Sequence, residues 1–98
     1  MKDPVKTVGI GWYDRDAYPR ILEMMEDAET LPDSYDDWAR IAKATERTIS
    51  AEGIKVVRAV IEPDQFKIWC KAEGLRCNVK ARMRWSGEFA SRTSAGDN

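Results

Sequence analysis

The sequence predicts a small α/β (or α+β) domain of order β-α-α-β-α-α, in which a two-stranded sheet is covered by about four helices. Two segments rich in β-branched residues, 5–12 and 54–61, predict the strands. The segments between and after them carry apolar residues at helical spacing, bounded by capping residues and glycines. Ninety-eight residues, of which 43% are apolar, suffice for one core. We therefore expect a single globular domain over residues 1–91 and a frayed polar tail over residues 92–98.

The first strand contains two glycines that fall on the same face. Gly9 and Gly11 are two residues apart, so we expect another element to pack closely over that face. Asp16 is the expected N-cap of the helix that follows, because it places Pro19 in the first turn, where a missing N–H costs nothing. This helix presents one apolar stripe, formed by Tyr18, Ile21, Leu22 and Met25.

The second helix has the clearest boundaries in the chain. Ser34 and Asp37 resemble a capping box, with aspartate in place of the usual glutamate. Gly53 predicts the end of the helix, because glycine readily adopts the left-handed conformation that follows a C-terminus. The residues at helical spacing between these ends are Trp38, Ile41, Ala42, Thr45 and Ile49.

The second strand, residues 54–61, is mostly apolar, so we expect both of its faces to be covered. Pro63 opens a third helix at its first position, with acidic residues near the positive end of the helix dipole. Gly74 ends that helix. Its apolar face consists of Phe66, Trp69 and Cys70.

Residues 75–85 carry two conflicting patterns. Apolar and polar residues alternate throughout the segment, which is typical of a strand. The composition instead favours a helix, because lysine, alanine, arginine and methionine are good helix formers. Asn78 can cap such a helix, with Ala81, Trp85 and Phe89 four residues apart on one face. We expect a helix, and the strand remains the alternative.

The residue inventory offers no recognisable catalytic site. Histidine is absent, which removes the commonest general base and metal ligand. Cys70 and Cys77 have the spacing of neither a redox pair nor a zinc site, so we expect inert structural thiols. A more reactive Cys77, in a turn beside Arg76, is the alternative. Gly9 and Gly11 lack the third glycine of a dinucleotide-binding turn. We therefore expect no catalytic residue, no cofactor and no metal. Whether the protein is an enzyme stays open, and the residues favour a protein that is not.

Two features bear on location. No apolar stretch approaches the roughly 18 residues that span a bilayer, so no membrane association is expected. The N-terminal residues 1–6 lack the apolar core of a secretory signal. We expect a cytoplasmic protein with reduced cysteines.

The charges are segregated along the chain. Residues 1–66 hold 9 basic and 14 acidic residues, whereas residues 67–98 hold 7 basic and 3 acidic residues. The basic segment is a candidate interaction site for nucleic acid, for an acidic protein surface or for the protein's own acidic half. A simple solvated face is the alternative. The candidate residues in this segment are Arg76, Lys80, Arg82 and Arg84.

Trp12 and Tyr13 close the first strand and are further candidate interaction residues, because tryptophan and tyrosine are enriched in interface hot spots. The alternative is that both rings cover the helix that follows them. The sequence leaves this choice open.

Two runs resemble sequences of a known group. Residues 31–38, Leu-Pro-Asp-Ser-Tyr-Asp-Asp-Trp, and residues 61–70, together with Gly74 and Ala81-Arg82, resemble small uncharacterised bacterial proteins of about this length. The resemblance implies a helix after Gly74 and a bacterial source. It implies no activity and no site residues.

These observations favour a protein-interaction or accessory module whose partner is a protein. A two-stranded sheet is marginal unless helices cover it or another chain extends it, so a homodimer is the expected assembly. The alternative function is a nucleic-acid-binding accessory protein that uses the basic C-terminal segment.

Overall fold

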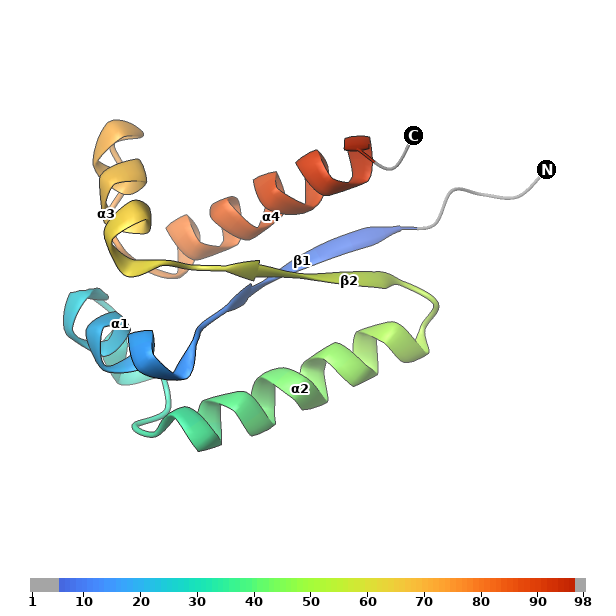
Figure 1. The fold of residues 1–98 in the computed structure, drawn as a ribbon, viewed down its shortest axis with the longest axis horizontal. Coiled ribbons are helices and arrows are strands. Elements are labelled where there is room, and N and C mark those ends of the chain that lie inside the picture. The colour runs from blue at the N-terminus through green and yellow to red at the C-terminus, as the bar shows by residue number, and fades with distance from the viewer. Residues whose placement is uncertain (1–5, 97–98) are drawn as a thin grey trace.

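Strands β1 (Thr7–Trp12) and β2 (Lys55–Val60) form a parallel two-stranded sheet in the computed structural model, which describes residues 6–96. Helices α1 (Tyr18–Met24) and α2 (Tyr35–Ala51) connect the two strands, and α3 (Pro63–Ala72) and α4 (Val79–Gly96) follow them (Figure 1). Short 3-10 turns, η1 (Arg15–Ala17) and η2 (Ala28–Thr30), flank α1. The predicted order β-α-α-β-α-α and the mixed α/β class are confirmed.

Helices α2 and α4 lie on opposite faces of the sheet (Figure 1). The Trp12 ring contacts Trp38 of α2, with 5.1 Å between the ring centroids. Gly9, on the other face, lies under the main chain of α4 at Ser86. Because side chains alternate along a strand, the even-numbered residues of β1 face α2 and the odd-numbered residues face α4.

The contact between β1 and α4 depends on glycine. A Cβ atom added to Gly9 would lie 2.2 Å from the carbonyl oxygen of Ser86. At Gly11 it would lie 3.3 Å from Cδ1 of Ile61. The close approach predicted for this face of the first strand is therefore confirmed.

Three of the four predicted helix starts are correct, and each depends on local contacts. The Ser34 hydroxyl oxygen accepts a hydrogen bond from the Asp37 main-chain N–H at 3.1 Å. The Asn78 side-chain oxygen accepts one from the Ala81 N–H at 3.3 Å, and residues 79–96 form the helix that the composition favours. Pro63 occupies the first turn of α3. The alternation in residues 75–85 therefore does not reflect a strand.

The two predicted helix ends are also confirmed. Gly53 follows α2 with φ of 82°, and Gly74 follows α3 with φ of 69°. Both angles lie in the left-handed region that glycine enters without steric cost.

Three local predictions need correction. Asp16 caps no helix: it lies in η1, and the main-chain carbonyl of Asp14 accepts from the N–H groups of Ala17 and Tyr18. The second strand has a helix on each face, but its cover is incomplete, because Arg58 and Val60 are exposed and Ala59 alone is buried.

The third correction concerns the C-terminal boundary. Helix α4 continues through residues 92–96, which the sequence assigns to the tail. No proline interrupts this segment, so the hydrogen-bonded ladder simply extends. Residues 97–98 lie outside the described part.

The core is concentrated at the carboxyl end of the sheet. Its buried side chains come from the end of β1, from all four helices and from the segment between β2 and α3. They include Trp12, Tyr13, Tyr18, Ile21, Trp38, Ile61, Phe66, Cys70 and Ala81. The amino end of β1, by contrast, carries only partly buried residues, Thr7 and Val8. None of the helices in the described residues has the length and apolarity needed to cross a membrane.

Candidate interaction site

Trp12 and Tyr13 do not form a surface site. Both side chains are buried, and their rings pack on Trp38 at centroid distances of 5.1 and 4.8 Å. The guanidinium of Arg58 covers the Trp12 ring at 3.8 Å. Burial also raises the pKa of Tyr13 to about 12. This corrects the interaction role suggested for the pair: the rings cover the helices that follow, as the alternative interpretation held.

Arg82 has a structural role. Its Nη1 and Nη2 atoms donate to the two carboxylate oxygens of Asp27 at 2.7 and 3.1 Å, and both side chains are largely buried. Asp27 also accepts a hydrogen bond from the Val79 N–H at 3.0 Å, so it caps the start of α4. The Arg82 hydrogen bond holds the pKa of Asp27 below its usual value. The pair joins α4 to the segment between α1 and α2.

Other members of the basic segment are paired in the same way. Arg76 Nε lies 3.1 Å from a carboxylate oxygen of Glu26. Arg84 contacts Glu73 at 2.5 Å and Glu88 at 2.9 Å. Lys80 is exposed. Two of the acidic partners, Glu26 and Asp27, belong to the acidic half, so the basic segment meets the protein's own acidic residues.

This pairing reduces the free positive charge on which nucleic-acid binding depends. Nucleic-acid binding stays an untested prediction for the segment. Each exposed ion pair contributes only about 0–1 kcal/mol of stability. The largely buried pair of Arg82 and Asp27 is therefore the one that matters most for the fold.

The thiols offer no nucleophile in the core. Cys70 is buried, and burial together with the contact to Cys77 raises its pKa to about 12. The expectation of a buried structural thiol at Cys70 is confirmed. Across residues 6–96 no three acidic, cysteine or histidine side chains converge as metal ligands would.

The sequence leads us to expect that the edges of a two-stranded sheet are open to a second copy, but it does not show which main-chain groups of β1 point outward. The Lys6 carbonyl accepts from the Lys55 N–H at 2.9 Å, and the Trp12 carbonyl accepts from the Ile61 N–H at 2.8 Å. Successive residues of a parallel strand point their main-chain groups to alternate sides. Even-numbered residues of β1 therefore pair with β2, and Thr7, Gly9 and Gly11 direct theirs to the opposite edge. Among the described residues no further strand occupies that edge.

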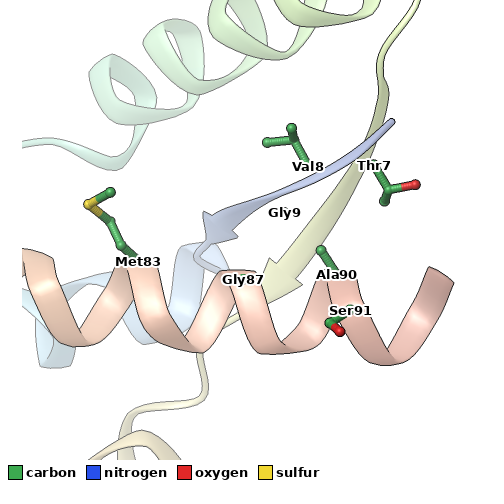
Figure 2. A pocket seen from close by; sticks show the side chains of 7 residues that line it. All are labelled: Thr7, Val8, Gly9, Met83, Gly87, Ala90 and Ser91. Atoms are coloured by element: carbon green, nitrogen blue, oxygen red, sulfur yellow. The ribbon is translucent and has the colours of Figure 1, made fainter. Parts of the chain in front are cut away.

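A groove follows this edge. It is a cavity of about 530 Å³ between β1 and the flank of α4 (Figure 2). Met83 rises from α4 beside β1 and is 70% exposed. We call this the edge groove; its lining residues are Thr7, Val8, Gly9, Met83, Gly87, Ala90 and Ser91.

Between Thr7 and Trp12 the edge of β1 lacks two of the usual protections against strand pairing. Residues 7–12 contain no charged residue and no proline, whereas β2 carries Lys55 and Arg58. Charges, prolines and covering elements are the devices by which sheet edges avoid association. The uncharged, glycine-containing first strand is the sequence signal that could have indicated this edge.

Comparison with known proteins adds no relative. No protein-family model, no curated protein and no solved structure matches the chain significantly.

Proposed function

We propose that the protein is a self-associating protein-interaction module without catalysis of its own, and that its binding surface is the edge groove. The observation that carries this proposal is the outward direction of the main-chain groups of Thr7, Gly9 and Gly11. A strand placed along this edge would satisfy them, as in binding by strand addition. The free thiols of Cys70 and Cys77 support a reducing location, the cytoplasm.

A second copy of the chain fits the edge by symmetry. In an antiparallel pairing about a two-fold axis, Gly9 lies opposite Gly9 of the partner subunit, and Thr7 lies opposite the partner's Gly11. Each opposed pair exchanges two hydrogen bonds, so three outward residues in each strand give six. The result is a continuous four-stranded sheet, which is more stable than a two-stranded one.

Hydrogen bonds alone do not hold such a dimer together. Six bonds at about 0.5–1.5 kcal/mol each give about 3–9 kcal/mol, and association costs about 4–15 kcal/mol. Apolar burial has to supply the difference. Met83, the most exposed apolar side chain of the groove, is the group that would supply most of it, at about 1.5–3 kcal/mol for full burial.

The two α4 helices would lie on the same face of the joined sheet. Neighbouring strands are about 4.8 Å apart, whereas packed helices need about 8–10 Å. The helices must therefore cross where their side chains are smallest. Gly87 provides that place, because a Cβ atom added there would meet no atom within 4 Å.

The experiment is light scattering after size-exclusion chromatography, from low to high micromolar concentration. The wild-type chain should shift from monomer to dimer as the concentration rises. Met83→Lys places a charge in the groove and should weaken the dimer at least tenfold. The matched control is Ile41→Lys on α2, which removes an apolar side chain of similar exposure, 53%, and should leave the dimer intact.

A second pair of variants tests the main-chain hydrogen bonds. Thr7→Pro removes an outward N–H without touching the ladder to β2, so it should weaken the dimer, whereas Thr7→Val keeps that N–H and should not. A wild-type chain that stays monomeric at every concentration would overturn the proposal. So would equal dimerisation of the Met83→Lys and Ile41→Lys proteins.

A further inference from the structure

A second cavity lies on the opposite side of α4 from the edge groove. It has a volume of about 380 Å³ and opens between α3 and α4. We call it the indole pocket; it is lined by Gln65, Ile68, Trp69, Trp85, Glu88 and Arg92. At about 100° per residue, positions 85, 88 and 92 project away from positions 83, 87 and 91, so the two sites can be occupied independently.

The walls of the indole pocket are apolar and held in place. The rings of Trp69 and Trp85 are nearly perpendicular, at 80°, with centroids 5.3 Å apart. Phe66 supports both from the core, at 5.8 and 5.4 Å. The Trp85 indole N–H donates to the Val60 carbonyl at 3.2 Å, so it is not available to a ligand. Ile68 completes the wall and is 69% exposed.

The polar rim of the pocket contains one arginine without an ion pair among the described residues. The carboxylate of Glu88 is held by Arg84 at 2.9 Å, and the same guanidinium contacts Glu73 and lies 5.7 Å from the centre of the Trp69 ring. Arg92 is exposed, and within the described residues it has no ion pair. The rim therefore presents the Arg92 guanidinium and the Gln65 amide beside an apolar cleft, together with the Glu88 carboxylate, which Arg84 already holds.

We propose that the indole pocket binds a small organic carboxylate with an aromatic or aliphatic body. The apolar body would lie against Trp69 and Trp85, where offset or edge-to-face ring contacts are favourable. The carboxylate would pair with the Arg92 guanidinium, whose planar fork matches its two oxygens. The volume is at the lower end of small-molecule sites, about 300–1,000 Å³, which suits a ligand of one or two rings.

The test uses the full chain labelled with ¹⁵N and two matched probes, naphthylacetate and the neutral naphthylacetamide. Each is titrated while the indole N–H signals of the four tryptophans are followed. The signals of Trp69 and Trp85 should shift, and those of the buried Trp12 and Trp38 should not. Naphthylacetate should bind at least tenfold more tightly than the amide, because a hydrogen-bonded ion pair adds to the same apolar contact.

Arg92→Gln should remove the difference between the two probes, since it removes the charge and keeps the apolar wall. Arg47→Gln, an exposed arginine on α2, is the matched control and should leave the tenfold preference unchanged. The proposal is overturned if neither probe shifts the Trp69 and Trp85 signals at millimolar concentration, if the two probes bind equally, or if Arg92→Gln retains the preference.

Discussion

The contact between Gly9 and α4 determines how far the fold tolerates a single methyl group. In Gly9→Ala, the new Cβ atom would lie 2.2 Å from the Ser86 carbonyl oxygen and 3.1 Å from the Ala90 Cβ. A comfortable carbon–oxygen contact is about 3.3 Å, so the two atoms must separate by about 1 Å. The opposing atom belongs to the main chain, which means that α4 as a whole has to move.

The cost of that movement is at the high end for overpacking. Extra methyl groups in a packed interior typically cost about 1–3 kcal/mol. Helix α4 is anchored at its start by Asp27 and Asn78, so it cannot shift without straining those hydrogen bonds. We expect Gly9→Ala to lower the free energy of unfolding by about 3 kcal/mol. At about 4–8 °C per kcal/mol, Tm should fall by about 12–24 °C.

Gly87→Ala is the matched control, because it adds the same methyl group to the same contact region. Nothing lies within 4 Å of the added atom, and alanine is a better helix former than glycine. This variant should gain about 0.5–1 kcal/mol. Both are measured by urea unfolding followed by circular dichroism, at low protein concentration. A Gly9→Ala protein as stable as the wild type would refute the packing of α4 on β1.

Two further predictions concern the ion pairs and the thiols. Arg82→Ala should cost about 1–3 kcal/mol, because it leaves the largely buried Asp27 carboxylate without its partner. Arg40→Ala, which breaks an exposed pair, should cost less than about 1 kcal/mol in the same urea assay. Because folding lowers the pKa of Asp27, this carboxylate stabilises the fold above pH 3.8, its ordinary pKa, and the stabilisation is lost as the pH falls through the folded pKa. Asp27→Asn should therefore weaken the loss of unfolding free energy at acidic pH. An unchanged pH dependence would contradict the assignment. Iodoacetamide at mildly alkaline pH should modify Cys77 in the native protein and reach Cys70 only after unfolding, as mass spectrometry of the peptides would show.

The sequence was most informative where the physics is local. The helix starts at Ser34 and Asn78 depend on side chains that accept from main-chain N–H groups three residues further on. The helix ends depend on the left-handed backbone of Gly53 and Gly74. Both are local effects, so they were predictable. The conflict in residues 75–85 was resolved by the same local chemistry. Its apolar alternation included Met83, which the helix leaves exposed, and which belongs to the edge groove instead of the core.

The candidate site was not predictable because it depends on contacts distant in sequence. Whether Trp12 is exposed depends on Trp38, and whether Arg82 is free depends on Asp27, more than fifty residues away. Charge counts indicate a basic segment but not which residues pair. An open edge was predictable from a two-stranded sheet, but which residues of β1 direct their main-chain groups outward depends on how β2 joins it.

Amide hydrogen exchange at Gly9 and Gly11 tests the central claim most directly, because both N–H groups point away from β2. The control amide is that of Ile61, which donates to Trp12 within the sheet. At high protein concentration, exchange at Gly9 and Gly11 should be slow and comparable to that at Ile61. On dilution to monomer it should become fast while Ile61 stays protected. Exchange at Gly9 and Gly11 that remains fast at every concentration would contradict pairing at this edge.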